Sequence, residues 1–424
     1  MTHADQPDQG QEPELLRTAD GLLLQTALNR VSRRAKIKAF LLVLPLLAFI
    51  LVSFVAPIGQ MLLRSVNNDQ FYSNMAELTL WFADKEFGVE PDEMAFTALA
   101  ADLTFAAKER TAGSVGTRVN YDLPGSRSLF TSAARKAKGL NPPFKDAFIK
   151  INKDWVDPEL WAAMHAASAT YTSSFYLAAV DRKRDTDGSI IQVDENRRIY
   201  VQLFWRTLWL SGLIAVLCLL LGFPVAHLLA TLPMRKASLL MILVLLPFWT
   251  SLLVRTTAWM VILQGQGVFN NILVSLGIVA DDNRFELMYN QTGSIVAMTH
   301  ILLPFMILPL YSVMRTIPPS YARAARSLGA TSWTTFRRIY LPQTIPGIGA
   351  GGLLVFILAV GYYITPALVG GASGQLISNQ IAFHMQDSLN WSMASALAAI
   401  LLAAVLVLYW LYDRLIGIDN MKLG

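Results

Sequence analysis

The sequence predicts an all-α polytopic membrane protein with six transmembrane helices. Of its 424 residues, 54% are hydrophobic and 15% are charged, whereas an ordinary soluble domain has about 25% charged residues. Several stretches lack Asp, Glu, Lys and Arg, and each can hold the ~17 to 25 residues that cross a hydrocarbon core about 30 Å thick. These stretches are 39–63, 207–234, 237–254, 287–314, 339–386 and 388–412. A bilayer is therefore the expected solvent for most of the chain.

The first transmembrane helix is expected at residues 39–63, after a cytoplasmic N-terminal segment formed by residues 1–38. Five cations and no acid precede this helix, and the positive-inside rule places that end in the cytoplasm. They are Arg30, Arg33, Arg34, Lys36 and Lys38. Residues 1–20 are polar, and no small-residue cleavage site follows, so we expect no signal peptide and a retained first helix.

Residues 64–203 have a different composition and are expected to form a soluble domain outside the cytoplasm, which we call the insert. From Ser65 to Tyr200 there are 19 acidic and 16 basic side chains. Apolar residues recur at helical spacing in 92–111 and 158–180, and 189–193 is typical of a short strand after the Asp187-Gly188 turn. A mainly helical insert is the prediction.

The remaining five transmembrane helices belong to residues 204–424. They are expected near 208–230, 239–262, 294–313, 347–369 and 393–412. Residues 261–280 are apolar enough for a seventh, but a seventh helix would put the arginine-rich loop, residues 315–345, on the opposite side from the cationic N-terminus. We therefore interpret 261–280 as interfacial or re-entrant, with both termini and the loop in the cytoplasm.

The loop at 315–345, which we call the elbow, has the pattern of two short helices joined at a glycine. Pro319 favours the start of a helix, and residues 322–328 are strong helix formers. Gly329 permits a positive φ that other residues resist, so it ends or bends the helix. In the second helix Trp333, Phe336 and Ile339 share a face, and Pro342 is expected to end it. An apolar edge with cationic flanks suits docking into the groove of a partner.

The elbow resembles the coupling loop of ABC-importer permeases. That family has Glu-Ala-Ala, then Gly-Ala, then Phe, Ile and Leu-Pro at fixed offsets. Residues that match are Ala324, Ala325, Gly329, Ala330, Phe336, Ile339, Leu341 and Pro342. The family's Glu is replaced by Arg323, which implies a compensating acid on the cognate ATPase. The resemblance implies the type I importer fold, with the loop seated in a cleft of the ATPase subunit.

The resemblance extends from about Phe204 to the C-terminus and is specific for the spermidine/putrescine type, the first of its two permease subunits. Phrases that carry it are 246–251, 254–256 and 361–366. It implies a bacterial inner-membrane location and a non-catalytic subunit without cofactors of its own. The implied partners are a homologous second permease, two ATPase copies that bind ATP, a periplasmic solute-binding protein and membrane lipid.

Residues that could line the translocation pathway are aromatic or charged and lie in apolar stretches. They are Trp249, Arg255, Trp259, Tyr362 and Tyr363. Aromatic faces attract organic cations, but a belt of interfacial or packed aromatics explains the same residues. Arg255 is expected to face water, pair with another group or lie near the outer interface. The substrate is expected to be a polyamine; other small organic cations, amino-acid derivatives and opines remain open.

Other function classes fit less well. An ion-gradient-driven secondary transporter would need intramembrane carboxylates, which the transmembrane stretches lack. No metal site and no enzyme active site is expected, because no His, Asp and Glu cluster has ligand spacing, and no phosphate-binding Gly-Lys loop is present. The net charge of +5 reflects cations flanking the helices rather than a nucleic-acid surface. For the insert, a contact with the binding protein and a spacer or folding role are both open.

Overall fold

The computed structural model describes residues 24–416 of the chain, so the outer parts of the expected cytoplasmic termini, 1–23 and 417–424, lie outside the described residues. The chain divides into two units, residues 1–61 and 62–424. Residues 24–64 form one long helical run: α1 (Leu24–Ile50), a π-helical turn η1 (Leu51–Val55) and α2 (Ala56–Arg64). Its stretch from Ala35 to Arg64 is apolar and long enough to cross a membrane, as predicted for residues 39–63.

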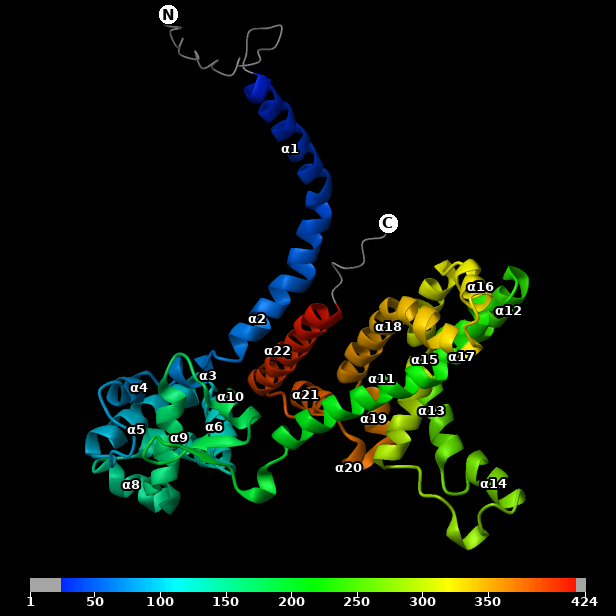
Figure 1. The fold of residues 1–424 in the computed structure, drawn as a ribbon. Helices are drawn as coiled ribbons and strands as arrows, with labels where there is room; N and C mark the ends of the chain where they lie inside the picture. The colour runs from blue at the N-terminus through cyan, green and yellow to red at the C-terminus, as the bar shows by residue number, and fades with distance from the viewer. Residues whose placement is uncertain (1–23, 417–424) are drawn as a thin grey trace, which may run out of the picture. The chain divides into compact units, whose positions relative to one another are not determined.

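The insert is a helical bundle with one small hairpin, in the second unit (Figure 1). Its elements are α3 (Asp69–Tyr72), α4 (Ala76–Ala83), α5 (Glu93–Lys108), α6 (Ala112–Asp122), α7 (Arg127–Lys136), η2 (Ala137–Gly139), α8 (Phe144–Ile151), η3 (Lys153–Val156), α9 (Pro158–Ser168), α10 (Ser174–Ala179), β1 (Arg182–Arg184), β2 (Ile190–Gln192) and η4 (Glu195–Arg197). The helix predicted at 92–111 is α5, whose N-cap Asp92 accepts a hydrogen bond from the Ala95 backbone. The region 158–180 is two helices rather than one, because α9 ends at Ser168 and residues 169–173 are not helical.

The insert has its own hydrophobic core. Trp155 and Phe96 are fully buried in it, and the rings of Phe130 and Phe148 contact Trp155 edge-on, each at 5.3 Å between centroids. The fully buried Arg118 belongs to the same region: its guanidinium pairs with Asp122 at 2.6 Å and lies 5.0 Å over the Phe175 ring. A charge at such depth is tolerated because it is paired and hydrogen-bonded.

The rest of the second unit, the permease core, is built on three long helices, α11 (Tyr200–Thr231), α15 (Gln291–Thr316) and α18 (Leu341–Gly361), packed on one another. The other elements are α12 (Met234–Leu245), η5 (Leu246–Trp249), α13 (Leu252–Leu263), α14 (Val268–Ser275), η6 (Asp281–Asn283), α16 (Pro319–Ser327), α17 (Ser332–Thr335), η7 (Phe336–Tyr340), α19 (Ile364–Val369), α20 (Gly371–Gly374), α21 (Ile377–Gln386) and α22 (Trp391–Ile416).

Small residues let these three helices approach closely. A Cβ on Gly351 would lie 2.8 Å from the Met306 sulfur, and one on Gly347 would lie 3.1 Å from Val313. The place of a Cβ on Gly349 is likewise occupied by the Tyr412 side chain, whereas a Cβ on Gly352 would meet no atom within 4 Å. Three glycines of α18 therefore have a packing role, and Gly352 has none among the described residues.

Within residues 24–416, five helices are long and apolar enough to cross a membrane, and a sixth span results if one bent pair counts as a span. That pair, residues 234–249 and 252–275, is bent by 95°. The span expected near 239–262 is therefore not a continuous helix: Pro247 lies in η5, and Thr250 and Ser251 are extended before the Ser251 hydroxyl caps α13. The span expected at 347–369 was also shifted, because the continuous helix runs from Ser332 to Gly361 and the chain then breaks at Tyr362.

Candidate coupling surface and polar clusters

The first helix of the elbow, α16, has a defined beginning and end. Pro318 is extended at the N-cap and Pro319 occupies the first turn, where its fixed φ fits and its missing N–H costs nothing. At the other end Gly329 has φ of +86°, its N–H donates to the Arg326 carbonyl (3.0 Å), and the Ala330 N–H donates to the Ala325 carbonyl (3.0 Å). These two bonds form a Schellman motif. The predicted stop at Gly329 is confirmed.

The second half of the elbow runs directly into the membrane-spanning helix. Thr331 caps it by accepting a hydrogen bond from the Thr334 N–H (3.2 Å), and the helix then continues from Ser332 to Gly361. The expectation that Pro342 ends this helix was wrong. In the π-helical turn η7 the Leu341 N–H bonds to Phe336, five residues back. This widened turn relieves the clash between a proline ring and the carbonyl four residues earlier.

Aromatic contacts fix the elbow to α11. The Phe336 ring stacks on Trp333 (5.8 Å) and on Tyr340 (6.2 Å) and meets Phe223 of α11 edge-on at 5.9 Å. The Tyr340 hydroxyl is hydrogen-bonded to His227 Nδ1 at 2.9 Å. His227 therefore connects α11 to η7.

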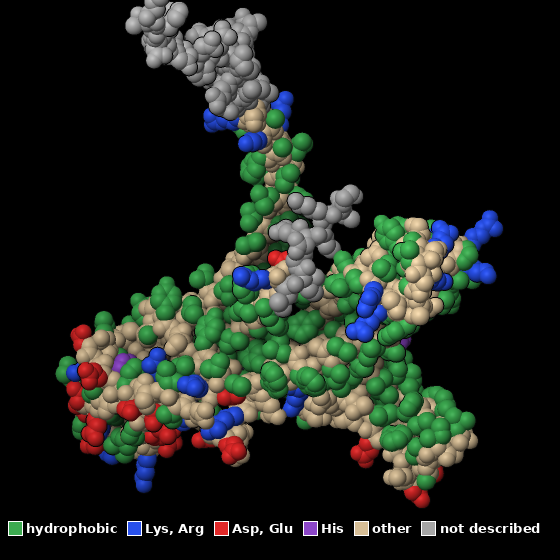
Figure 2. All heavy atoms as spheres, in the orientation of Figure 1, with side chains coloured by type: hydrophobic (Ala, Val, Ile, Leu, Met, Phe, Trp, Pro, Cys, Tyr) green, Lys and Arg blue, Asp and Glu red, His purple; other side chains and the backbone are tan. Residues whose placement is uncertain are grey.

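The outward surface of the elbow is exposed, partly apolar and cationic. Leu328 is 89% exposed and Trp333 is 68% exposed. The exposed cations around them are Arg323, Arg326, Arg337 and Arg338. None of these four forms an ion pair with another residue in the range 24–416. Figure 2 shows Lys and Arg side chains at the end of the core where α12 and α16 lie.

The structure brings all the predicted elbow residues into this one surface. Ala324 and Pro342 are exposed, and Ala325, Ala330, Phe336, Ile339 and Leu341 are half-buried against the rest of the elbow. Helical spacing and the glycine indicated the apolar face and the end of the first helix, whereas the other residues were named from the resemblance to the coupling loop of ABC-importer permeases. The anchoring pair Phe223 and His227 on α11 was not predicted as part of the site, because sequence distance hides a contact across more than a hundred residues.

A second group of polar residues lies where α13, α15 and α19 meet. Trp259 of α13 donates from its indole N–H to His300 Nδ1 of α15 at 3.1 Å. The buried hydroxyls of Thr256 and Thr365 are hydrogen-bonded at 3.1 Å, which connects α13 to α19. Arg255 of α13 is half-buried, and its Nε is buried without a hydrogen-bond partner among the described residues.

The break between α18 and α19 is stabilised by side chains of α21. The Ser378 hydroxyl donates to the Tyr362 carbonyl (2.6 Å), and the Asn379 amide donates to the Tyr363 carbonyl (2.8 Å). Trp249 is 76% exposed on η5 and makes none of these contacts. Four of the five predicted pathway residues therefore lie on elements that meet, while Thr256, Thr365, Ser378 and Asn379 were missed as ordinary polar residues of apolar stretches.

The insert is joined to one end of the core, at the start of α11, by a polar cap. Asp181, buried at the end of α10, accepts hydrogen bonds from the backbone N–H groups of Ile199 (3.1 Å), Tyr200 (3.1 Å) and Val201 (2.8 Å). A carboxylate at a helix N-terminus satisfies unpaired donors and complements the helix dipole. The insert therefore caps the first core helix, α11.

Apolar packing completes this junction. Phe175 and Ala179 of α10 share one hydrophobic cluster with Leu203 of α11 and with Met393 and Leu397 of α22. The Tyr200 hydroxyl is hydrogen-bonded to His384 of α21 at 2.9 Å. The insert is packed onto three helices of the core rather than attached by a linker.

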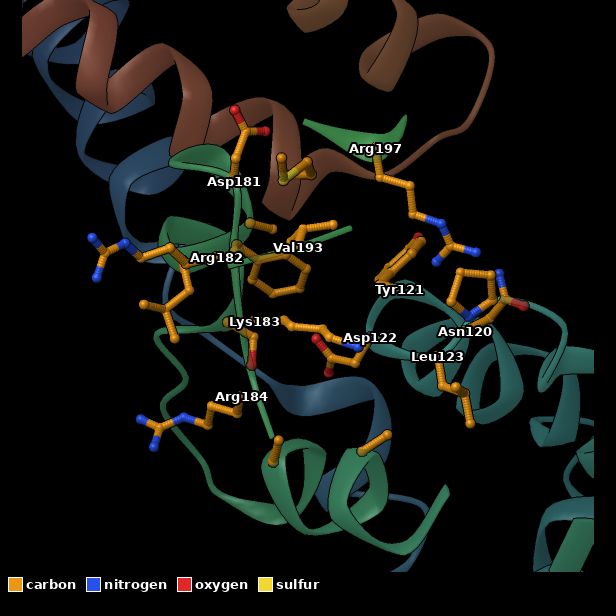
Figure 3. A pocket seen from close by; sticks show the side chains of 18 of the residues that line it. Asn120, Tyr121, Asp122, Leu123, Asp181, Arg182, Lys183, Arg184, Val193 and Arg197 are labelled. Atoms are coloured by element: carbon orange, nitrogen blue, oxygen red, sulfur yellow. The ribbon is translucent and has the colours of Figure 1, made fainter. Parts of the chain in front are cut away.

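A cavity of about 580 Å³ lies at the junction. Figure 3 shows Lys183 and Asp122 pointing toward one another in it, while Arg182 and Arg184 point to the other side of β1. Two of its carboxylates are already used, since Asp122 pairs with Arg118 and Asp181 caps α11. Its remaining charges are of both signs and do not define a ligand class.

Residues 219–416 match the family described as "Binding-protein-dependent transport system inner membrane component". The chain is 37% identical over 224 residues to the spermidine/putrescine transport system permease protein PotB of Haemophilus influenzae, covering 53% of this chain and 78% of that protein. PotB of Escherichia coli is 35% identical over 222 residues, covering 52% of this chain and 80% of that protein. A solved bacterial alginate ABC transporter in complex with alginate pentasaccharide-bound periplasmic protein aligns with a TM-score of 0.44 and 18% identity, over 54% of this chain and 81% of that one.

Proposed function

Because the chain belongs to the family of binding-protein-dependent inner-membrane transport components, we propose that it is the first permease subunit of an ATP-driven polyamine importer. The observation that carries the proposal is the identity to spermidine/putrescine permeases over about four-fifths of their length. The family match includes the whole elbow. The substrate class is a polyamine such as spermidine or putrescine.

The proposed assembly contains this chain, a homologous second permease, two ATPase subunits and a periplasmic solute-binding protein. ATP is bound and hydrolysed by the ATPase subunits, and this chain forms half of the pathway. The elbow and both termini lie in the cytoplasm, and the insert lies in the periplasm, in agreement with the cations that precede the first helix.

Coupling follows from the exposed surface of the elbow. Closure of the ATPase dimer moves Leu328 and Trp333, and the stacked rings from Trp333 to Tyr340 pass that movement to α11 and α18. The core then alternates between inward-open and outward-open arrangements. Arg255, Trp259, Tyr362 and Tyr363 are proposed to contact the substrate in passage, with Trp249 at the rim of the pathway.

The insert is proposed to receive the binding protein. Because it caps α11 and packs on α22, docking on the insert acts directly on the outer ends of core helices. Leu80 and Met94, which are 69% and 72% exposed on α4 and α5, are apolar positions on its surface. Replacing both by Asp is expected to reduce the stimulation of ATP hydrolysis by the binding protein. Unchanged stimulation would favour a spacer role.

The test of the function is uptake into proteoliposomes that contain the complete assembly. Labelled spermidine should accumulate in the compartment that the elbow faces. It should do so only when that compartment contains ATP and the binding protein is present on the opposite side of the membrane. Accumulation driven by an ion gradient without ATP would contradict the proposal and support a secondary transporter.

Arg323 gives a sharper test of the coupling surface. It is exposed and has no ion-pair partner in the described part of the chain, so its acidic partner is expected on the ATPase. Arg323→Glu should weaken co-purification of the ATPase by about tenfold, which is the effect of losing one charge-assisted contact and gaining a repulsion. The control is Arg235→Glu, since Arg235 is also exposed but lies at the start of α12, outside the elbow. Equal loss in both variants would point to general charge rather than to a specific partner.

A further inference from the structure

The insert contains a second cavity, of about 670 Å³, formed entirely by its own residues. It lies between α4, the loop 84–91, α9 and the turn that joins β1 to β2. Five of its side chains are rings: Trp81, Phe82, Phe87, Trp161 and His165. We call it the aromatic cavity.

The rings form a continuous wall. His165 stacks on Phe82 (4.8 Å between centroids) and on Phe87 (4.0 Å), and Trp81 meets Trp161 edge-on at 5.8 Å. Burial lowers the pKa of His165, so its imidazole is neutral at pH 7 and adds an aromatic face without a positive charge.

Close backbone packing holds Phe87 in place. Gly188 has φ of +83°, and a Cβ there would lie 3.1 Å from the Phe87 side chain. The turn that carries Gly188 is closed by a hydrogen bond from its N–H to the Asp185 carbonyl at 3.0 Å. The ring wall is therefore built by two loops that meet, and only glycine fits at their contact.

Two cations of the chain already lie on these rings. Lys85 Nζ lies 5.7 Å from the Trp81 ring centroid, and the Arg184 guanidinium carbon lies 5.7 Å from that of Phe87. Both distances are within the range of favourable cation–π attraction. Lys85 and Arg184 are exposed, so another cation can replace them at the ring faces.

Three carboxylates at the cavity supply the opposite charge. Glu86, Glu90 and Asp187 are exposed, line the cavity and form no ion pair within residues 24–416. Asp187 accepts a hydrogen bond from the Ser189 N–H at 2.9 Å. Two carboxylates of the junction cavity differ, because Asp122 pairs with Arg118 and Asp181 caps α11.

We propose that the aromatic cavity is an external binding site for small organic amines, whose ammonium groups lie on Trp81 and Phe87 and are neutralised by Glu86, Glu90 and Asp187. The choice of an amine with several charges rests on the proposed polyamine function. Such a site would hold substrate next to the place where the binding protein releases it, outside the membrane-spanning helices.

The experiment uses the full chain in lipid nanodiscs without its partners, and the probe is labelled spermidine in equilibrium dialysis. Saturable binding that weakens with salt is expected. Glu86→Gln with Glu90→Gln should raise the Kd by at least about tenfold, from the loss of two nearby charges. The matched control is Glu109→Gln with Glu195→Gln, since both residues are exposed on the insert away from the cavity. The control should leave the Kd unchanged.

A second variant tests the ring wall without changing charge. Gly188→Ala forces Phe87 to move and should also raise the Kd, while hydrogen exchange in α5 and α9 reports whether the insert is still folded. Absence of saturable spermidine binding, or equal losses in the two charge variants, would overturn the proposal.

Uptake by the complete assembly shows whether the aromatic cavity or the proposed polyamine function has failed. If the complete assembly imports spermidine and the isolated chain does not bind it, the site alone is wrong. If the chain binds spermidine and the assembly does not import it, the substrate assignment is wrong and the amine site stands.

Discussion

At the scale of single residues, Gly329 sets the geometry of the elbow. Its φ of +86° is required by the Schellman motif, while no atom lies within 4 Å of the place a Cβ would occupy. Gly329 is therefore required for its backbone conformation and not because a side chain would clash. An ordinary L-residue in this left-handed conformation loses about 1–2 kcal/mol of conformational free energy. Asn tolerates this conformation better than other residues with a side chain.

Gly329→Pro should abolish coupling, because proline fixes φ near −65° and removes the N–H that bonds to Arg326. The measurement is spermidine uptake per ATP hydrolysed in the reconstituted assembly. Gly329→Asn is the control and should retain most of the coupling. Normal uptake by the proline variant would mean that the elbow does not transmit the movement.

Asp102 gives the insert a pH-dependent stability. It is 4% exposed, and its carboxylate accepts hydrogen bonds from the backbone N–H groups of Leu78 (2.8 Å) and Glu77 (3.2 Å). Burial outweighs these bonds and raises the pKa of Asp102 to about 6, from 3.8 when exposed. The folded state holds the Asp102 proton more tightly than the unfolded state does. The contribution of this proton to the free energy of unfolding of the insert is therefore complete below pH 3.8 and is lost as the pH rises through 6.

Hydrogen exchange in α4 and α5 of the full chain should therefore be slower at pH 5 than at pH 7.5, after correction for the intrinsic rate. Asp102→Asn should remove most of this difference, and Asp84→Asn, an exposed residue at the end of α4, should keep it. A wild-type insert that becomes more stable between pH 5 and pH 7.5 would contradict the assignment.

At the scale of elements, the cap on α11 is the clearest link between the insert and the core. Asp181→Ala removes three hydrogen bonds to the first turn of α11 and should destabilise that turn by about 1–3 kcal/mol. The expected readout is faster hydrogen exchange at residues 199–203 and reduced stimulation of ATP hydrolysis by the binding protein. Asp194→Ala, also near the junction but exposed, should change neither. Faster exchange with full stimulation would limit Asp181 to a structural role.

The helices were predictable where composition determines them, and the breaks were not. Charge-free stretches located the membrane-spanning helices because a bilayer excludes charge over their whole length. The break at Thr250 and the π-helical turn before Pro342 depend on local backbone hydrogen bonds, which hydropathy does not register. The glycine-rich segment after α19 is likewise held by local contacts, since the Gly374 carbonyl accepts a hydrogen bond from the Ser294 hydroxyl at 3.3 Å.

At the scale of the whole molecule, the elbow was predictable and the junction was not. The elbow is local in sequence, so its glycine and helical spacing indicated the helix end and the apolar face, and the resemblance to a known coupling loop added the other residues. The junction joins α10 to α22 across about two hundred residues, and Phe175 and Met393 are ordinary apolar residues in the sequence. The predicted pathway residues are intermediate, since Arg255 and Trp259 were singled out but His300, the hydrogen-bond partner of Trp259, lies on another helix.

The unbroken helix from Ser332 to Gly361 has a geometric consequence. Thirty residues at 1.5 Å each make a rod about 45 Å long. A tilt of about 5° at one end then displaces the other end by about 4 Å, close to the width of a methylene chain. The far end is the break at Tyr362 and Tyr363, whose carbonyls accept two side-chain hydrogen bonds from α21. In the proposed assembly, a small rotation at the elbow would thus be amplified into a displacement large enough to open or close a passage for a linear amine.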